Sequence, residues 1–398
     1  MRAAHLADLH LGKRQFSATE GGRNAREADV ERAFNLAIDD IIAQQPDLVT
    51  IAGDIFDHLR ISDYARMVFL RGVQRILEET NAVVIILQGN HEAARTIESL
   101  TPIALATLFR DRVHVVCDFK RIRFEVTDNF PTGPQVTCSV ACFPFTTRVA
   151  EATHRLEPDL DADVNVLLMH AAVRGAADGD TLPYFYGGQG ALDIGRAASE
   201  WDVVACGDYH EFTRLHPTAL AFYSGSIERT SSDIWKEVSP KGWVLTDTVA
   251  KTMEFREIPT RPMWDIRFLG PDEVTAPSAE ALNAQLDKLA NHPDNLQDLA
   301  GAIVRLKVED FPREERDHID HDLVRKLRGL CLHFQLDISF SVIEAADLGD
   351  RRERGVAMSL AAEAAAFFAS DPEEVRALVL RALEIEAGVE DLEEVAVA

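Results

Sequence analysis

The sequence is poor in several features that would place a protein in a specialised class. No apolar run is long enough to span a bilayer, and no apolar segment typical of signal peptides precedes the first predicted strand. The five cysteines are odd in number and lack CxxC spacing, which argues against a disulfide framework and a cysteine-rich zinc site. We therefore expect a cytosolic protein without membrane association, whose reduced cysteines mostly lie in the core.

Basic residues are scarce as well. The chain carries 41 Lys and Arg against 66 Asp and Glu, a net charge of −25. So acidic a protein does not adhere broadly to nucleic acid, whose phosphates attract basic surfaces. A local basic groove, a site in which metal ions supply the positive charge, and a basic partner subunit all stay open. Four basic residues after the first strand are expected to be either solvated or in contact with phosphates: Lys13, Arg14, Arg23 and Arg26.

What the sequence does contain is a regular alternation of buried strands and helices. With 398 residues, 46% of them hydrophobic, the chain can bury a large core and is long enough for two or three domains. Fully apolar runs predict buried strands, and apolar residues at helical spacing predict helices between them. The expected strands are 2–7, 48–52, 83–87, 164–169 and 203–206, and the expected helices are 29–44 and 63–79.

Each of these five strands ends in residues that can ligate a metal. The residues are Asp8 and His10, Asp54, Asn90 and His91, His170, and Asp208 and His210. One such residue alone would most often cap a turn. Five strands that all end in possible metal ligands would rarely arise by chance. In open α/β sheets, sites are built at the carboxyl ends of the strands.

The ligand types narrow the chemistry. Carboxylate, amide and imidazole ligands without thiolates suit Mn²⁺, Fe²⁺, Mg²⁺ or Zn²⁺. About seven ligands are too many for one ion and suit two ions about 3.5–4 Å apart that share a bridging carboxylate. Such a pair clamps a phosphoryl group and lowers the pKa of a bridging water, so the expected reaction is hydrolysis of a phosphoester.

In its motifs the chain resembles the calcineurin-like metallophosphoesterases. The matching motifs are D-x-H at 8–10, GD-x-x-D at 53–57, GNHE at 89–92, His170, and GD-x-H at 207–210. Three longer stretches are similar to the SbcD-type nuclease subunit of the DNA double-strand-break repair exonuclease complex: ADLHLG at 7–12, AGDIFD at 52–57 and SGSIERT at 224–230. The resemblance covers roughly residues 1–245 and implies an α/β fold, a four-layer α/β/β/α sandwich.

The resemblance also implies a role for each matched residue. The first ion would be held by Asp8, His10 and His210, and the second by Asn90, His170 and Asp208. Asp54 would bridge the ions and hold the attacking water. His91 would be catalytic, protonating the leaving oxygen or steadying the phosphate. Residues expected near the ligands or the substrate are Asp57, Glu92, Arg95, Ser226, Glu228 and Arg229.

One ligand departs from the family pattern. Where the family usually has GH-x-H, this chain has Gly207-Asp208-Tyr209-His210, so Asp208 replaces a histidine of the second ion. A carboxylate still ligates and adds negative charge, which favours a harder ion such as Mn²⁺ or Mg²⁺. The alternative is a weakened second site in a slow or inactive enzyme.

Further regions follow the motifs. Residues 1–262 form the expected nuclease domain, and 263–345 a small α+β capping domain beside DNA, with strands at 264–268, 302–308 and 336–343 and helices at 278–290 and 314–330. Residues 346–398 are expected to be a linker and a helical tail. The tail either docks on its own chain or, as the resemblance implies, recruits an SMC-like ATPase subunit.

These features together predict a two-metal DNA exonuclease or endonuclease that uses Mn²⁺ in preference to the other ions. The resemblance further implies a homodimer that acts on DNA in the cytoplasm. Two alternatives stay open. One is a metallophosphoesterase for small nucleotides or phosphoproteins, and the other is a non-catalytic scaffold with a degenerate metal site.

Overall fold

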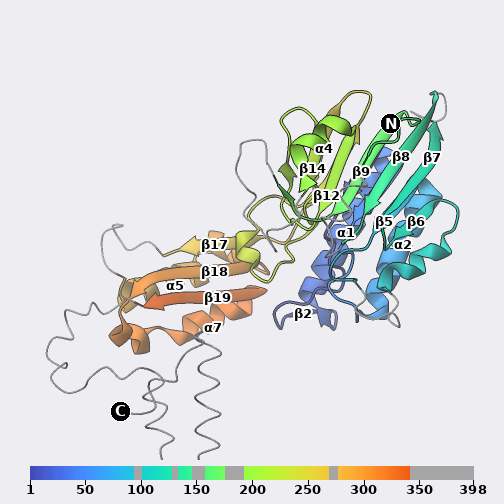
Figure 1. The fold of residues 1–398 in the computed structure, drawn as a ribbon. Helices are drawn as coiled ribbons and strands as arrows, with labels where there is room; N and C mark the ends of the chain where they lie inside the picture. The colour runs from blue at the N-terminus through green and yellow to red at the C-terminus, as the bar shows by residue number, and fades with distance from the viewer. Residues whose placement is uncertain (94–100, 128–132, 146–156, 175–191, 269–276, 341–398) are drawn as a thin grey trace, which may run out of the picture.

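The computed structural model of the chain describes residues 1–93, 101–127, 133–145, 157–174, 192–268 and 277–340 (Figure 1). Three parts of the sequence prediction lie outside these residues, namely Arg95, the end of the predicted capping domain from 341 onward with the last residues of its strand at 336–343, and the tail at 346–398. The larger part of the described chain is built on two six-stranded sheets, and a three-stranded sheet follows them. Within the described residues, no helix has both the length and the apolar character needed to cross a membrane.

The first six-stranded sheet has the order β16-β15-β1-β4-β5-β6. Its parallel strands are β1 (Arg2–Leu6), β4 (Leu48–Ala52), β5 (Val83–Leu87) and β6 (Val113–Val116). The antiparallel strands are β15 (Gly242–Asp247) and β16 (Thr252–Glu257). The strands predicted at 48–52 and 83–87 are confirmed with their bounds.

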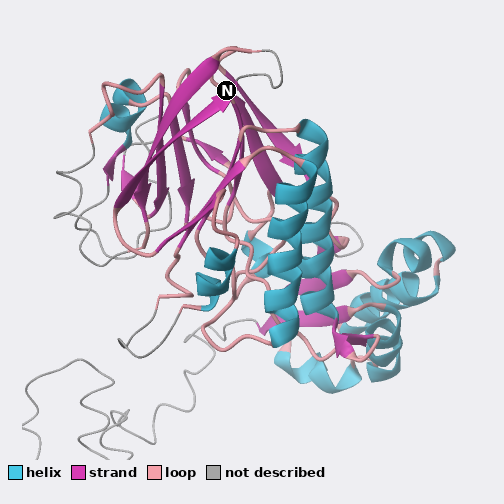
Figure 2. Cartoon of the chain, turned by 90° about the vertical axis from the view of Figure 1, so that its right-hand side faces the viewer, coloured by secondary structure: helices cyan, strands magenta, loops and turns pink. Residues whose placement is uncertain are grey.

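Helices α1 (Ala25–Gln44) and α2 (Asp63–Glu79) lie side by side over the outer face of this sheet (Figure 2). α2 has its predicted bounds. α1 begins at Ala25 rather than at 29, because the Asn24 side chain accepts hydrogen bonds from the backbone of Arg26 and Glu27 and caps the helix there. The outer core joins the helices to the sheet through residues such as Val30, Phe34, Leu6 and Ile51.

The second six-stranded sheet has the order β13-β14-β12-β9-β8-β7. Its strands are β7 (Lys120–Thr127), β8 (Gln135–Phe143), β9 (Val164–His170), β12 (Val203–Gly207), β13 (Thr213–Arg214) and β14 (Leu220–Tyr223). Helix α4 (Ile194–Glu200) packs on its outer face. Strands β8, β9, β12 and β14 are parallel, so their carboxyl ends share one edge.

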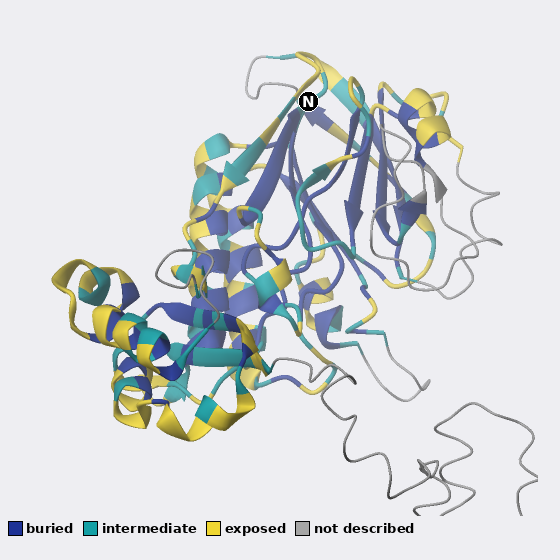
Figure 3. Ribbon diagram, turned by 90° about the vertical axis from the view of Figure 1, so that its left-hand side faces the viewer, coloured by how far each residue is buried: buried dark blue, intermediate teal, exposed yellow. Residues whose placement is uncertain are grey.

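The two sheets pack face to face. The burial of alternate side chains along β9 in two different cores shows this directly, because successive side chains of a strand point to opposite faces. Val166 and Leu168 lie in the core between the sheets, whereas Leu167 and Met169 lie in the core under α4. The order of layers is helix, sheet, sheet, helix, which confirms the predicted α/β/β/α sandwich. Figure 3 shows the buried strands inside and the exposed helical surfaces outside.

The three-stranded sheet forms a small unit with a core of its own. Parallel strands β17 (Met263–Arg267), β18 (Ile303–Phe311) and β19 (His333–Phe340) carry helices α5 (Ala279–Asn291), α6 (Pro293–Leu299) and α7 (His321–Leu330). This core contains Leu282, Leu286, Val304, Leu306 and Leu327. The unit, residues 263–340, is called the small domain below. The division of the whole chain into three domains stays a prediction.

Three predicted elements of the small domain are wrong in their bounds, the first being the strand predicted at 302–308, which runs to Phe311 as β18. The helix predicted at 314–330 is split into a 3₁₀ turn, η4 (Arg313–His318), and α7, because Asp320 caps a new helix by accepting from the backbone of Asp322 and Leu323. The strand predicted at 336–343 already begins at His333. Short elements elsewhere are β2 (Thr19–Glu20), β3 (Arg23–Asn24), β10 (Val173–Arg174), β11 (Leu192–Asp193), η1 (Pro102–Leu108) and η3 (Ile234–Lys236).

The cysteines are all free thiols, as predicted. Four of them are buried, namely Cys138, Cys142, Cys206 and Cys331. Cys117 is exposed, because it follows the end of β6 rather than lying within the strand.

Candidate metal centre

The polar residues that follow the five central strands meet at one edge of the sandwich. The loops after β1 and β4 are joined by backbone hydrogen bonds, from Asp8 N to the Gly53 carbonyl (3.1 Å) and from His10 N to the Asp54 carbonyl (2.9 Å). The second sheet joins them through Asp208, whose N–H donates to both carboxylate oxygens of Asp8 at 3.1 and 3.2 Å. The topology therefore brings together residues that are about 200 positions apart in the chain, such as Asp8 and Asp208.

The backbone of this edge is unusual. Asp8, His10, Asp54 and Asp208 have φ angles of 51°, 47°, 50° and 96°, in the left-handed region that non-glycine residues rarely adopt. Such a conformation costs about 1–3 kcal/mol for each residue and is concentrated at functional sites. Four of the seven predicted ligands therefore sit on a strained backbone that the surrounding sheets hold in place.

Three glycines of the motifs allow the loops to approach so closely. A Cβ atom on Gly53 would overlap the imidazole of His170, and one on Gly89 would overlap the Asp54 carboxylate. A Cβ atom on Gly207 would overlap the carbonyl oxygen of Ala52. The glycine that precedes each polar residue in the GD and GN motifs is thus required by contact across the site.

The histidines are oriented alike, with Nδ1 turned to the protein and Nε2 turned inward. His170 donates from Nδ1 to the Ala52 carbonyl at 2.7 Å, and its Nε2 lies 2.8 Å from Asn90 Oδ1. His91 donates from Nδ1 to the Asp57 carbonyl at 2.5 Å. An Nδ1–H held in this way leaves Nε2 as the free ring nitrogen, as in histidines that bind metals.

His10 and His210 follow the same rule with carboxylates as partners. His10 Nδ1 lies 3.4 Å from Asp57 Oδ1, and His210 Nδ1 lies 3.5 Å from Glu237 Oε1. Their Nε2 atoms face each other at 3.1 Å. Burial lowers the pKa of His10 to about 4, so the ring is neutral, and with Nδ1 beside Asp57 its Nε2 points inward.

Among the described residues, three groups of side chains at this edge could each hold a metal ion. The groups are Asp8, His10 and His210; Asp8, Asp54 and His170; and His10, Asp57 and His91. The first has the composition expected for the first ion. The second contains Asp54 and His170 of the expected second set, and Asp208 Oδ1 lies 3.7 Å from His170 Nε2. Asp54 lies centrally, with His170 Nε2 3.6 Å and His10 Nε2 3.8 Å from its carboxylate.

The electrostatics of the site fit a bound cation. Burial raises the pKa of Asp8 to about 6, because a carboxylate without water is costly to ionise. Burial lowers the pKa of His170, but Asp54, Asp8 and Asp208 outweigh it and raise the value to about 9. Burial also raises the pKa of Asp54, while His170, His10 and His91 bring it below its ordinary value. Buried carboxylates thus depend on nearby positive charge, which divalent ions would supply to this oxygen and imidazole donor set.

Two residues predicted to lie near His91 stabilise the loops that carry the expected ligands. Glu92 is fully buried and accepts from Phe56 N (2.6 Å) and Gly89 N (3.0 Å), so it ties the loop after β4 to the loop after β5. Burial and Asp54 raise its pKa to about 8. Asp57 lies between His10 and Lys13 Nζ, which is 3.1 Å away. Burial raises the pKa of Asp57, but His10 and Lys13 outweigh it and hold the value at about 2.

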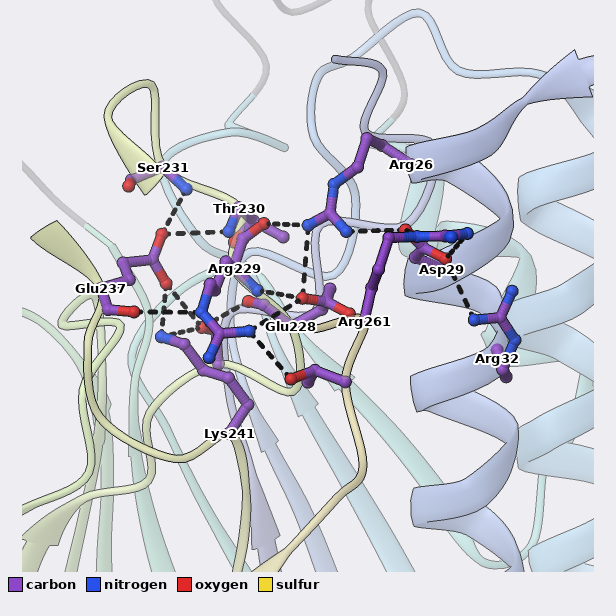
Figure 4. A network of polar contacts seen from close by, with 12 residues as sticks. Arg26, Asp29, Arg32, Glu228, Arg229, Thr230, Ser231, Glu237, Lys241 and Arg261 are labelled. Carbon is purple, nitrogen blue, oxygen red and sulfur yellow. Dashed lines mark hydrogen bonds and ion pairs between the residues drawn. The ribbon is translucent and has the colours of Figure 1, made fainter. Parts of the chain in front are cut away.

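The predicted residues of the SGSIERT stretch belong to a largely buried polar network that contacts His210, and Figure 4 labels Glu228 and Arg229 within it. Ser226 Oγ donates to the Glu228 carbonyl at 2.8 Å. Arg229 donates to Thr260 Oγ1 at 2.8 Å. These contacts support the loop, and contact with a substrate stays a prediction for all three residues. Arg95 lies outside the described residues.

The sequence reasoning missed the other members of this network. Arg26 is only 1% exposed, so the expectation that it is solvated or binds phosphate is wrong. Its position in the first turn of α1, behind the Asn24 cap, points it into the protein. Glu237 and Lys241 are also buried and form an ion pair. Their i, i+4 spacing was the only signal, and it is typical of exposed helices rather than buried loops.

Comparisons with known proteins agree with this geometry. A family model described as calcineurin-like phosphoesterase matches residues 1–212. A protein of Methanocaldococcus jannaschii named DNA double-strand break repair protein Mre11 is 36% identical over 105 residues, 26% of this chain and 27% of that protein. The protein of the same name from Methanopyrus kandleri is 29% identical over 180 residues, 44% of this chain and 38% of that protein. The chain therefore matches well under half the length of these relatives.

Among solved structures, the calcineurin-like phosphoesterase YfkN of Bacillus subtilis is similar with a TM-score of 0.36 and 12% identity. The match covers 65% of this chain and 88% of that one.

Proposed function

The chain belongs to the calcineurin-like phosphoesterase family, and we propose that it is a two-metal nuclease that processes DNA ends in double-strand-break repair. The family uses divalent metal ions, and three groups of Asp and His side chains here could hold one. The two relatives named as DNA double-strand break repair proteins support DNA as the substrate. The observation that carries the proposal is the convergence of inward Nε2 atoms on the carboxylate of Asp54.

The residues that would hold the ions follow from the groups described above. Asp8, His10 and His210 would hold the first ion, and Asn90, His170 and Asp208 the second, with Asp54 between them. When bound, two divalent ions polarise the phosphoryl group and lower the pKa of a water, as in other two-metal hydrolases. We favour Mn²⁺ because Asp208 adds a hard oxygen ligand where the family usually has histidine.

Asp54 is built to hold the attacking water. Its Oδ1 accepts from His91 N at 2.9 Å, which fixes the carboxylate plane. Its Oδ2 lies 3.8 Å from His10 Nε2 and 3.9 Å from His91 Nε2, at the centre of the inward atoms. A water aligned there would form the new bond to phosphorus, while the bond from phosphorus to the leaving oxygen breaks on the opposite side.

His91 is placed to deliver the proton that the leaving oxygen needs. Its Nδ1 proton is held by the Asp57 carbonyl, so Nε2 is the nitrogen that can take up a proton and pass it to the leaving oxygen. The side chain is 37% exposed, the most open of the four histidines, and can therefore touch a substrate as large as DNA.

The wider assembly is also a proposal. We infer that the nuclease works with an SMC-like ATPase subunit through the tail at 346–398, as a homodimer in the cytoplasm. The resemblance of the SGSIERT stretch to the SbcD-type nuclease subunit supports this.

The test is a substrate panel for the purified full chain with Mn²⁺. It compares end-labelled linear duplex DNA, a closed circular duplex, a cyclic nucleotide and a phosphopeptide, each with and without EDTA. The proposal predicts EDTA-sensitive shortening of the linear duplex. Preference for the cyclic nucleotide or the phosphopeptide would contradict it and favour the small-substrate alternative, and hydrolysis of none would favour a scaffold.

A further inference from the structure

We propose that Asp29 and Arg261 are positioning residues that couple the small domain to the His210 side of the metal centre. The inference rests on the proposed function of that centre and deepens it. It starts from a continuous chain of buried polar contacts from His210 to the small domain, most of which is drawn in Figure 4.

The first step links His210 to the loop at 226–231. Lys241 Nζ donates to the His210 carbonyl at 2.8 Å and to Ser226 Oγ at 3.1 Å, and it pairs with Glu237. Glu237 Oε1 accepts from Ser231 N at 2.6 Å and lies 3.5 Å from His210 Nδ1. Both the backbone and the ring of His210 therefore depend on where this loop lies.

The second step links the loop to α1. Arg26 donates from Nη2 to the Arg229 carbonyl at 2.8 Å and to Glu228 Oε1 at 3.2 Å. From Nη1 it donates to Asp29 Oδ2 at 2.7 Å. The guanidinium thus joins the loop to Asp29. Because its N–H donors lie in one rigid plane, it fixes both the distance and the angle between the two groups that it binds.

The third step links Asp29 to the small domain. Arg261 binds both carboxylate oxygens of Asp29 at 2.8 Å, and its Nη1 donates to the Gly301 carbonyl at 2.8 Å. Gly301 comes just before β18, and Arg261 itself comes two residues before β17. A rotation of the small domain must therefore move Arg261 or break one of its bonds.

A second contact from the small domain reaches the same framework. The Arg305 guanidinium of β18 lies 4.6 Å from the ring centroid of Trp235, two residues before Glu237. Separately, Phe16 stacks on His333 of β19 at 3.8 Å. Because Asp29 is fully buried, removal of Arg261 leaves its carboxylate with only Arg26 and Arg32 as partners, and we expect the position of Arg26 to shift. A partner or substrate that moves the small domain would then change how His210 is held.

The experiment uses the full chain with Arg261→Gln and Arg261→Lys, and Arg256→Gln as a matched control. Arg256 makes a two-point pair with another aspartate of α1, Asp40, at 3.1 and 2.7 Å, and it also binds Glu254, which lies beside it on β16. The readouts are Mn²⁺ affinity by calorimetry and the absorption spectrum of the Co²⁺-loaded protein, with circular dichroism to verify folding. Neither readout requires DNA cleavage.

Arg261→Gln is expected to weaken Mn²⁺ binding about three- to tenfold and to change the Co²⁺ bands, less than the ~10–100-fold typical when a group that directly orients a ligand is lost. Arg261→Lys keeps the charge without the two-point geometry and should fall between Gln and wild type. Arg256→Gln should match wild type. Unchanged binding and spectra in folded Arg261→Gln, or equal losses in Arg256→Gln, would overturn the inference.

If Arg261→Gln does not fold, Arg261→Lys decides by the same readouts, and wild-type values in that variant would overturn the inference. Absence of Mn²⁺ binding in the wild type would instead contradict the proposed function itself.

Discussion

The Nε2 atoms of His10 and His210 lie 3.1 Å apart although the residues are 200 positions apart in the chain. Each ring has a carboxylate beside its other nitrogen, Asp57 for His10 and Glu237 for His210. Two imidazoles oriented in this way converge on one point, where Asp8 supplies a carboxylate. The arrangement is that of a ligand set whose orientation is fixed before an ion binds.

The first prediction concerns His91. His91→Asn should lower Mn²⁺-dependent cleavage of DNA about 10²–10⁴-fold, because the variant has no ring nitrogen to protonate the leaving oxygen. Mn²⁺ binding should change little, since the ligands expected for both ions are intact. Cleavage rate and calorimetric Mn²⁺ affinity are measured side by side.

The matched control for that prediction is His58→Asn. His58 lies near Asp57 on the same loop, with 55% of its side chain exposed. The His58→Asn variant should cleave DNA at the wild-type rate. Equal losses in the two variants would mean that replacing any histidine near this site lowers cleavage, rather than loss of the His91 imidazole in particular.

The second prediction concerns Asp208. Asp208 Oδ1 lies 3.7 Å from His170 Nε2, so its charge bears directly on the expected second ion. Asp208→His should retain two ions and shift the preference from Mn²⁺ and Mg²⁺ toward Zn²⁺, because imidazole replaces a hard oxygen ligand. Competition titrations of the variant against wild type measure this. An unchanged order of metal affinities would show that Asp208 does not ligate.

The third prediction concerns pH. The raised pKa of His170, about 9, means that the metal-free protein holds a proton there at pH 7 to 8. A metal ion needs the neutral ring, so binding must release this proton, and affinity should rise by up to about tenfold per pH unit until pH 9. Below about pH 6, Asp8 holds a second proton that binding must also release.

Calorimetry in two buffers with different enthalpies of ionisation measures that release. About one proton per chain from His170 is expected near pH 7.5, and more near pH 5.5. Metal affinity that stays flat between pH 7 and 9 would rule out a protonated His170 in the metal-free protein.

The fourth prediction concerns Gly89. A Cβ atom at this position would overlap the Asp54 carboxylate and backbone, so Gly89→Ala should destabilise the fold by about 1–3 kcal/mol and lower metal affinity. Gly329→Ala is the control, because that position in α7 faces open space and alanine favours helix. Chemical denaturation measures the free energy of unfolding of both variants. A Gly89→Ala protein as stable as Gly329→Ala would show that the loops are not packed so closely.

The sequence predicted the candidate site residues well where they directly follow an apolar run. Asp8, Asp54 and His170 could be located because each ends a buried strand, and parallel topology then requires their ends to meet. The four layers followed from the family resemblance of the motifs at the ends of those strands. Helix caps were harder to predict. Because Asn24 and Asp320 cap α1 and α7, these helices begin at other residues than the sequence analysis predicted.

The framework behind the ligands could not be predicted in this way. Glu237, Lys241 and Asp29 are charged residues outside any motif, and only their partners make burial tolerable. Glu237 and Lys241 pair with each other across four residues, but other partners lie far away in sequence, as Arg261 does from Asp29, and a single sequence does not report such pairing. The left-handed backbone of Asp8 and Asp208 is equally invisible, because neither residue type requires it.

The most direct measurement of the central claim is anomalous diffraction at the manganese edge from crystals grown with Mn²⁺. The account predicts two peaks about 3.5–4 Å apart with Asp54 between them, one beside His10 and His210 and the other beside Asn90 and His170. A single peak, or peaks that do not contact Asp54, would contradict a two-metal centre at this site.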